Sequence, residues 1–300
     1  MLNDFKQFVE QNDLGVLLEN ESMVHHTYVK TGGRVKMVYV PHSVEALAKT
    51  YKFIKDNEIK YYVIGRGSNL LFSDNPGEMV VIKLSNILDD VEIVGTNVVV
   101  GSGFSLQALS RKVSKLGLSG LEFAGGIPGA MGGSTFMNAG AHTGDLSRVI
   151  TRVTTVTSSG NIKHYTNEEC QFSYRHSIFQ ENDDIIVEIE MELEQCEIAE
   201  VFKRMSGNLE YRKEMQPLNM PSFGSTFRNP KGEHAGRLVE LVGLKGYKIG
   251  GAQISEKHAN FIVNFDLATT QDYIDLIELA KSRVKAETGF ELETEVRIVE

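Results

Sequence analysis

Residues 125–134 read Gly-Gly-Ile-Pro-Gly-Ala-Met-Gly-Gly-Ser, so that five of ten consecutive residues are glycine. Glycine loses more conformational freedom on folding than any other residue, so an ordered loop of this composition costs free energy that a bound group would offset. Glycines also leave main-chain N–H groups uncovered, which suits a diphosphate lying against the backbone. The stretch therefore predicts a loop that cradles a phosphorylated cofactor, and residues 138–141, Asn-Ala-Gly-Ala, extend it.

A second glycine site precedes it at residues 63–71, Val-Ile-Gly-Arg-Gly-Ser-Asn-Leu-Leu. A strand that ends in this way lets main-chain N–H groups approach an anion closely. The site is not a dinucleotide-binding fingerprint, because Leu70 stands where the third glycine would be, and it is not a P-loop, because no Gly-Lys-Ser/Thr follows. On spacing alone, a phosphate-binding turn and a plain tight turn both remain open.

The periodicities around these loops predict a mixed α+β fold. A strand is expected at residues 37–40, and Ser43 is expected to cap a helix whose apolar residues run at helical spacing to Ile54. A strand at 61–64 leads into the glycine site just described. Further short strands are expected at 79–82, 98–100, 152–156 and 185–187, with one helix, at 105–116, among them.

The last third of the chain has a different pattern. Helices are expected at 197–212 and 234–242, and a strand at 261–263. A third helix is expected where apolar residues recur four, three and four positions apart, at Tyr273, Ile277, Ala280 and Val284.

The final residues alternate in polarity and predict a strand. Its apolar face would carry Leu292, Thr294, Val296 and Ile298, and its other face Glu295 and Arg297. A domain boundary is expected near residue 195, where a strand pattern passes into a charged helix. This gives a first domain at 1–195, with subdomains at about 1–75 and 76–195, and a second domain at 196–300.

The composition excludes several classes of protein. The 300 residues carry 31 Lys and Arg against 40 Asp and Glu, and a net charge of −9 lacks the basic footprint of a nucleic-acid-binding protein. Cys170 and Cys196 lie far apart without metal-ligand spacing, so reduced thiols and no metal are expected. No apolar run suggests a membrane span and the N-terminus has no secretory pattern, so a cytoplasmic protein is expected.

Three dispersed segments hold groups that could carry chemistry, at residues 174–177, 224–229 and 293–297. Taken singly, each is typical of a surface turn or an exposed strand end. A hydrolase nucleophile at Ser225 is disfavoured, because Phe223 and Phe227 stand where the Gly-x-Ser-x-Gly elbow needs glycines.

Taken in chain order, five motifs closely resemble the UDP-N-acetylenolpyruvoylglucosamine reductase family. They are GRGSNLL at 65–71, GGIPGAMGGSTFMNAGA at 125–141, FSYRHSIF at 172–179, GSTFRNP at 224–230 and LETEVR at 292–297. The likeness runs from about residue 27 to the C-terminus. The Met-Asn-Ala-Gly-Ala form of the loop, and the lack of an insert after Arg175, resemble the shorter type II branch.

The resemblance implies an FAD-binding fold of the vanillyl-alcohol-oxidase type, followed by a C-terminal α+β substrate-binding domain. It implies FAD reduced by NADPH, and non-covalent attachment is expected because the glycine loops contain His142 but no cysteine. Arg297 would lie near the pyrimidine edge of the flavin. The residues that the resemblance assigns to FAD are Gly65, Arg66, Gly67, Ser68, Asn69, Leu70, Gly126, Ile127, Gly129, Gly132, Gly133, Ser134, Asn138, Ala139, Gly140 and Arg297.

The reaction implied is reduction of UDP-N-acetylglucosamine enolpyruvate to UDP-N-acetylmuramate in peptidoglycan precursor synthesis. Flavin N5 would deliver hydride, Arg175 and Glu295 would stabilise the enolate, and Ser225 would protonate its Cα. Substrate contacts are expected from Tyr174, Arg228 and Asn229, with Arg212, Lys213 and the loop at 255–258 as further candidates. His142 departs from the family pattern, since relatives carry Tyr there.

Two alternatives stay open at this level. An alcohol or aldonolactone oxidase of the same fold would reoxidise rapidly in air. A non-catalytic nucleotide-binding module would need the glycine loops but not Arg175, Ser225 and Glu295.

Overall fold

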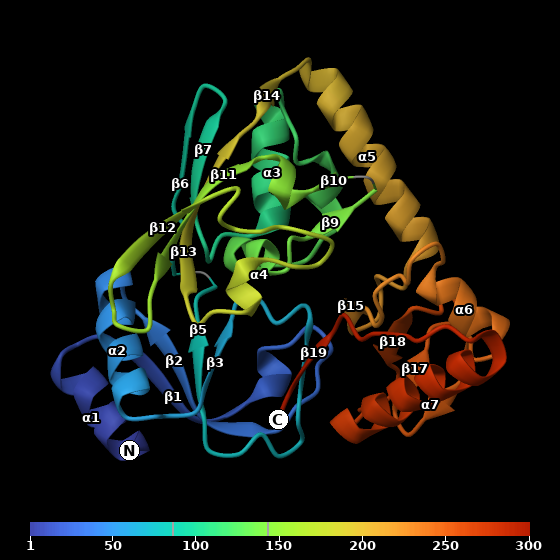
Figure 1. Cartoon of the computed structure of the whole chain (residues 1–300), viewed down its shortest axis with the longest axis horizontal. Helices are drawn as coiled ribbons and strands as arrows, with labels where there is room; N and C mark the ends of the chain where they lie inside the picture. The colour runs from blue at the N-terminus through green and yellow to red at the C-terminus, as the bar shows by residue number, and fades with distance from the viewer. Residues whose placement is uncertain (86, 143) are drawn as a thin grey trace. The chain divides into compact units, whose positions relative to one another are not determined.

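The computed structural model describes residues 1–85, 87–142 and 144–300, and these form two compact units (Figure 1). Unit 1 comprises residues 1–19, 36–66 and 78–210, and unit 2 comprises residues 20–35, 67–77 and 211–300. Both units are discontinuous in sequence, because two N-terminal segments pack with the C-terminal third. The domains expected at 1–195 and 196–300 stay a prediction. The two compact units divide the chain at other residues.

One sheet of unit 1 has the strand order β1-β2-β5-β3, in which β2 and β3 both run parallel to β5. The Ser43 hydroxyl accepts the Ala46 N–H (3.1 Å) and starts α2, as its position in the sequence predicts. Buried residues of α1, α2 and the sheet form one apolar core. The elements are α1 (Leu2–Gln11), β1 (Gly15–Ser22), β2 (Arg34–Pro41), α2 (Val44–Asp56), β3 (Tyr61–Ile64) and β5 (Val80–Lys83).

The second sheet of unit 1 is antiparallel, with the order β12-β11-β13-β7-β6. Its core also includes residues of helix α3 (Leu106–Lys115), which Ser105 caps. The expected short strands and the helix at 105–116 are confirmed. The strands are β6 (Val91–Val94), β7 (Asn97–Gly101), β11 (Ile150–Val156), β12 (Ile162–Thr166) and β13 (Ile185–Glu192).

The expectation of a single helix in this region is wrong, because the glycine-rich stretch also forms α4 (Met131–Phe136). Glycine and serine have low helix propensity, so no sequence pattern indicates this helix; packing against the sheet stabilises it. The remaining small elements of unit 1 are β8 (Leu118–Ser119), η2 (Glu122–Gly126), β9 (Gly140–Ala141), β10 (Gly144–Asp145), η3 (Leu146–Arg148), η4 (Ile178–Gln180) and β14 (Glu194–Gln195).

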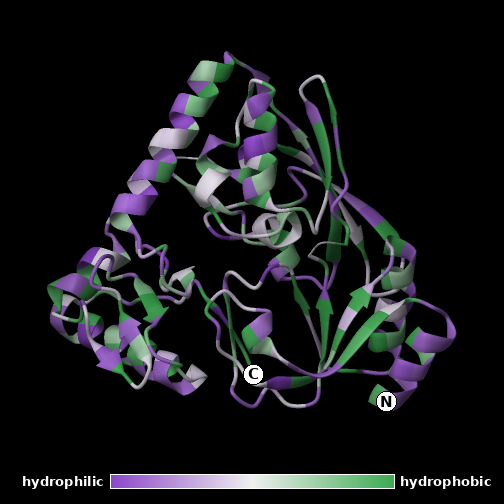
Figure 2. Ribbon diagram, turned by 180° about the vertical axis from the view of Figure 1, so that it is seen from behind, coloured by the Kyte–Doolittle hydropathy of each residue, from purple (hydrophilic) through white to green (hydrophobic). Residues whose placement is uncertain are grey.

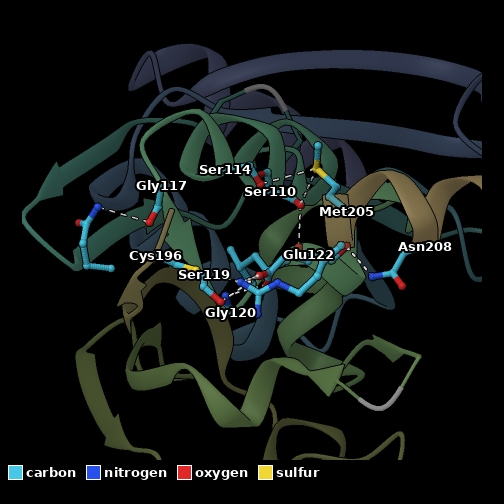
Figure 3. Close-up of polar contacts among 12 residues, drawn as sticks. Ser110, Ser114, Gly117, Ser119, Gly120, Glu122, Cys196, Met205 and Asn208 are labelled. Carbon is cyan, nitrogen blue, oxygen red and sulfur yellow. Dashed lines mark hydrogen bonds and ion pairs between the residues drawn. The ribbon is translucent and has the colours of Figure 1, made fainter. Parts of the chain in front are cut away.

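Helix α5 (Ile198–Met215) belongs to unit 1 up to Glu210. It is mixed in hydropathy along its length (Figure 2), and only Val201 and Met205 are buried. Figure 3 shows how it is fixed: the Met205 sulfur lies 3.6 Å from the Ser114 hydroxyl, and Asn208 donates to the Glu122 carbonyl at 3.2 Å. These contacts hold α5 against α3 and η2.

Unit 2 contains an antiparallel sheet in the order β15-β18-β17-β16 and a parallel pair, β4 with β19. The expected apolar stripe of α7 is confirmed, since its four residues are all buried in the core of this unit. Its elements are η1 (Met23–His25), β4 (Leu70–Phe72), β15 (Ser222–Ser225), α6 (Ala235–Leu241), β16 (Lys248–Ile249), β17 (Ala252–Ile254), β18 (Phe261–Asn264), α7 (Thr270–Thr288) and β19 (Arg297–Val299).

The prediction of a continuous final strand is wrong. Leu292 and Val296 are buried as expected, but Ile298 is 38% exposed and Val299 is buried in its place. Thr294 forms an isolated bridge with Phe227, whereas β19 pairs with β4. Because the segment changes partner, its alternation is interrupted, and Glu295 and Arg297 do not share one face of a single strand.

Within the described ranges, none of the helices is long and apolar enough to cross a membrane.

Candidate active site

Gly65, in the first glycine site, lies beside the main glycine loop in unit 1. Gly65 directly follows β3, and a Cβ built on it would lie 2.9 Å from the Ala130 Cβ. Real side chains do not approach so closely, so glycine is required at position 65. Two stretches that the sequence presents separately therefore contact each other.

Sequence reasoning missed a third segment of this site, residues 101–106. It runs along the main glycine loop through three main-chain hydrogen bonds: Gly132 N to Ser102 O (2.8 Å), Met131 N to Phe104 O (2.8 Å) and Leu106 N to Gly129 O (3.1 Å). A Cβ on Gly132 would lie 2.8 Å from the Ser102 Cβ. The signal that could have revealed it is Gly101-Ser102-Gly103, a glycine pair directly after a strand.

These loops fit a phosphorylated cofactor. Gly133 is exposed, and a Cβ at that position would meet no atom within 4 Å, so a ligand could lie against its main chain. The hydroxyls of Ser102 and Thr135 are buried and have no hydrogen-bond partner among the described residues. Both hydroxyls are inaccessible from outside the fold, so the open position of this loop is the main chain at Gly133.

The same loop positions the turn that carries Arg175. The Asn138 side chain donates to the Ser173 carbonyl (2.9 Å) and accepts the Ser147 N–H (3.0 Å). The Arg175 guanidinium donates to the Gly140 carbonyl at 2.7 Å. Three residues expected at the site, Asn138, Gly140 and Arg175, are therefore brought together.

Arg175 has a φ of +57°, a conformation that non-glycine residues rarely adopt. Reciprocal main-chain hydrogen bonds between Ser173 and His176 (both 3.1 Å) close the turn, and Gln180 donates to the Arg175 carbonyl at 3.0 Å. The guanidinium carbon lies 5.0 Å from the ring centroid of Tyr174, which is half exposed. A strained residue held by this many contacts is typical of a functional position.

In unit 2, Ser225 ends β15 just after a register shift between Ser222 and Ser225, where Gly224 adopts a φ of +84°. Asn260 fixes the chain beyond it, because its carbonyl accepts the Thr226 N–H (2.7 Å) and its side chain bonds both N and O of Phe227 (2.9 and 2.8 Å). The half-buried Ser225 thus sits on rigid main chain.

The main chain of Glu295 is hydrogen-bonded to two other motifs of unit 2, at Thr226 and at Asn69. Its N–H donates to the Thr226 carbonyl (2.8 Å), and its carbonyl accepts the Asn69 side-chain amide (3.1 Å). The Asn69 carbonyl in turn accepts the Arg297 N–H (3.1 Å), and Leu70 pairs with Arg297 in the parallel ladder. Asn69, Ser225, Glu295 and Arg297 are therefore neighbours in one unit.

The turn at Gly67 supports this arrangement. Gly67 has a φ of +66°, and a Cβ on it would lie 2.0 Å from the His26 carbonyl oxygen. Its own carbonyl accepts the Tyr28 N–H at 3.0 Å. The first glycine site is thus divided between the units: Gly65 and Arg66 belong to unit 1, and residues 67–70 to unit 2.

The further expected residues have local roles in the fold. Asn229 accepts the Ala235 N–H (3.0 Å) where α6 begins, and Arg228 N–H donates to the Glu293 carbonyl (2.9 Å). Lys257 donates to the Lys213 carbonyl. Burial lowers the pKa of Arg212 to about 10.

His258 is the titratable group nearest to Asn260 in the sequence, and its Nδ1 accepts the Asn260 N–H at 3.2 Å. Burial lowers the pKa of His258 below its usual 6.5. The neutral ring therefore supports the residue that holds Thr226 and Phe227.

Family models match two parts of the chain. Residues 35–166 match the FAD binding domain, and residues 216–299 match the UDP-N-acetylenolpyruvoylglucosamine reductase, C-terminal domain. A UDP-N-acetylenolpyruvoylglucosamine reductase of Bacillus licheniformis is 46% identical over 98% of this chain and 97% of that protein. The crystal structure of the Thermus caldophilus reductase superposes with a TM-score of 0.82 at 32% identity, covering 95% of this chain and 99% of that one.

A Physcomitrella patens BBE-like protein shares the fold alone, with a TM-score of 0.50 at 14% identity over 64% of this chain and 44% of that one. The chain is thus a flavoprotein whose FAD-binding domain has the fold of the vanillyl-alcohol-oxidase type, followed by a mixed α+β C-terminal domain. Within that class, the chain belongs to the UDP-N-acetylenolpyruvoylglucosamine reductase family.

Proposed function

We propose that this protein uses NADPH to reduce UDP-N-acetylglucosamine enolpyruvate to UDP-N-acetylmuramate, a cytoplasmic step of peptidoglycan precursor synthesis. One observation carries the proposal: hydrogen bonds within unit 2 link the segments of Ser225, Glu295 and Arg297. Thr226, next to Ser225, bonds to Glu295, and Asn69 bonds to both Glu295 and Arg297. Neither a binding module nor an oxidase of this fold needs the segments that carry Ser225 and Glu295 to be hydrogen-bonded to each other in this way. Family membership supports the same reaction.

FAD, when bound, supplies the hydride that saturates the enolpyruvyl double bond. The glycine loops would hold it, with main-chain N–H groups of residues 65–70 and of Gly133 as donors to its diphosphate. Arg297 would provide a fixed positive charge near its ring. No cysteine lies in these loops, and we propose that the cofactor is not covalently attached.

Arg175 and Glu295 stabilise the negative charge that develops on the carboxyl side of the substrate. The strained turn and the bond to Gly140 restrict the Arg175 side chain, so little reorganisation is needed when charge develops. Glu295 serves as a neutral acid that hydrogen-bonds the substrate carboxylate.

Ser225 donates the proton to Cα. A hydroxyl is a weak acid, but an enolate carbon is a strong base at the moment of transfer, and a donor within about 3 Å suffices when nothing more acidic competes. The bonds from Asn260 to Thr226 and Phe227 keep this hydroxyl in place.

The sugar nucleotide binds mainly to residues 196–300 in this proposal. Tyr174, Arg228 and Asn229 contact it, and Arg212, Lys213 and the loop at 255–258 are further candidates. His142 stands where relatives carry Tyr, and its imidazole ring could still stack or hydrogen-bond there.

Anaerobic spectroscopy tests the proposal directly. NADPH should bleach the flavin of the purified protein, and the enolpyruvyl sugar nucleotide should restore the colour with formation of UDP-N-acetylmuramate. Restoration by air alone, with no product from the sugar nucleotide, would indicate an oxidase, and absence of bleaching would indicate a binding module.

A further inference from the structure

A cluster of polar contacts in unit 1 joins helix α5 to the turn that leads into the main glycine loop, residues 125–134 (Figure 3). At its centre is Glu122, the first residue of η2, which is only 9% exposed. Because η2 ends at Gly126, it contains the first two residues of the loop. Glu122 itself belongs to none of the motifs that predict the site.

The Glu122 carboxylate closes a tight turn. One oxygen accepts the Ser119 hydroxyl (2.9 Å) and lies 3.2 Å from a guanidinium nitrogen of Arg204, and the other oxygen accepts the Gly120 N–H (2.8 Å). Gly120 has a φ of +128°, and a Cβ on it would lie 2.9 Å from Val149 Cγ1. A nearly buried carboxylate costs free energy unless its oxygens are hydrogen-bonded, and here both of them are.

The main chain around Glu122 is held from outside as well. The Leu121 carbonyl accepts the Ser110 hydroxyl (2.6 Å), and the Glu122 carbonyl accepts the Asn208 amide of α5 (3.2 Å). A Cβ on Gly125 would lie 2.9 Å from Met205 Cγ, so α5 packs directly on the first residue of the loop. A loop rich in glycine has few side chains of its own to pack, so contacts at its ends decide where it lies.

The same turn also supports the strand pair that bonds Arg175. Phe123 packs on Gly144, since a Cβ there would lie 2.7 Å from Phe123 Cδ1. Gly144 of β10 pairs with Ala141 of β9, and the carbonyl of the adjacent Gly140 accepts the Arg175 guanidinium at 2.7 Å. The η2 turn therefore contacts two functional elements of unit 1, the glycine loop and the pair β9–β10.

We propose that Glu122 is a positioning residue, whose carboxylate holds η2 in the conformation in which the main glycine loop accepts FAD and the Gly140 carbonyl meets Arg175. The inference rests on FAD use by the proposed function. The bonds to Ser119 and Gly120 carry the effect. The ion pair adds little, because the Arg204 side chain is 49% exposed and exposed ion pairs contribute weakly to stability.

Loss of these bonds changes cofactor affinity through the free protein. Without them, η2 and the first residues of the loop adopt several conformations, of which only some bind FAD. The apparent affinity falls in proportion to the fraction of protein that is competent to bind. FAD affinity and kcat at saturating FAD are therefore the quantities that a positioning role changes.

The test compares Glu122→Ala with Glu122→Gln in the full-length protein. Flavin is removed, FAD affinity is measured by fluorescence titration well below the melting temperature, and kcat is measured at saturating FAD. Glu122→Ala should bind FAD about tenfold or more weakly, since two hydrogen bonds of the turn are lost, and its kcat should fall. A glutamine oxygen can accept the Gly120 N–H while its amide donates to the Ser119 hydroxyl. Glu122→Gln should therefore stay within about threefold of the wild-type affinity.

Two further variants complete the comparison. Arg204→Ala, which removes only the ion pair, should behave as Glu122→Gln does. Ser119→Ala removes one bond of the turn, so its FAD affinity should fall by about threefold or more, and it serves the test if Glu122→Ala does not fold.

Asp184→Ala is the matched control, because this carboxylate of the same unit accepts the Tyr165 hydroxyl (2.6 Å). It should lower the flavin-free melting temperature and leave FAD affinity unchanged.

Three results would overturn the inference. The first is an FAD affinity in Glu122→Ala and Ser119→Ala that falls no further than in Asp184→Ala, which would show a role in stability alone. The second is an equal loss in Glu122→Gln and Glu122→Ala, which would assign the effect to the charge. The third is a normal kcat of Glu122→Ala at saturating FAD, which would remove the link to Arg175. Failure of the wild-type chain to bind FAD would overturn the proposed function as well, so the two failures are distinguishable.

Discussion

The side-chain amide of Asn69 donates a 3.1 Å hydrogen bond to the main-chain carbonyl of Glu295, although the two residues are 226 positions apart. The Asn69 carbonyl accepts the Arg297 N–H at the same distance. One residue of a glycine site thus fixes the main chain on both sides of Val296, and with it the points from which the Glu295 and Arg297 side chains extend.

Asn69→Ala should reduce the unfolding free energy by about 1 kcal/mol, the usual worth of one hydrogen bond, and should lower kcat as well. The catalytic loss follows because the Glu295 main chain loses its bond to the Asn69 side chain, whereas the main-chain bond to Arg297 N–H remains. Urea unfolding and steady-state kinetics measure the two effects. Asn57→Ala, which removes a 2.9 Å bond to the Phe53 carbonyl at the end of α2, should affect stability alone. Equal kinetics in the two variants would contradict the anchoring role.

Glu295→Gln should leave the fold intact, because the bonds from its main-chain N and O to Thr226 and Asn69 do not involve the carboxyl group. Turnover should fall by at least about tenfold, since an amide cannot supply the acidity of a carboxyl group. Turnover at saturating substrate and the thermal melting curve decide it. Unchanged turnover, or a large loss of stability, would count against the assignment; Glu293→Gln, on the exposed neighbour, is the control.

Ser225→Ala should separate the two half-reactions. Reduction of the flavin by NADPH needs no proton from Ser225 and should proceed at close to the wild-type rate. The second half-reaction, with the enolpyruvyl substrate, should slow by about 10²–10⁴-fold, as for loss of a general acid. Anaerobic stopped-flow absorbance follows both phases.

Ser225→Cys should recover part of the second phase, because a thiol is also a proton donor. Equal losses in both phases of Ser225→Ala would instead indicate that the Gly224-Ser225 turn only positions its neighbours, and no loss would remove Ser225 from the mechanism.

His258 should make the stability of unit 2 depend on pH. Burial lowers its pKa below 6.5, so its stabilising contribution is complete above the unfolded-state pKa and is lost as the pH falls through the lower folded-state pKa. Protonation also removes the Nδ1 acceptor from Asn260. Between pH 7.5 and 5.5 the melting temperature of His258→Gln should fall by roughly 1–3 °C less than that of the wild type. His164→Gln, on β12 of unit 1, should keep the wild-type pH dependence.

Denaturation with acid or heat should release the flavin into solution. Addition of FAD to flavin-free protein should raise the melting temperature with concentration, as expected for a ligand that binds the native state reversibly. Yellow colour that stays with the precipitated chain would contradict non-covalent binding.

The sequence by itself determined the local elements of the fold. Ser43 and Ser105 begin helices where their capping positions predict, and the stripe from Tyr273 to Val284 is buried, because caps and apolar periodicity act over a few residues. The glycine stretches were identified for the same reason, since their composition is unusual over ten residues. Even so, helix α4 was missed, because glycine and serine carry no helical pattern.

Only the tertiary structure decided what depends on distant partners. The final segment carries a period-two pattern, but its pairing partner changes at Val296. Before that residue it pairs with residues 226–228, and after it with β4, so Ile298 is exposed. The meeting of Asn69 with Glu295, and the two unpartnered hydroxyls of Ser102 and Thr135, leave no trace in local periodicity. Hydrogen bonds between residues hundreds of positions apart form wherever packing brings donor and acceptor together, and packing is a property of the whole chain.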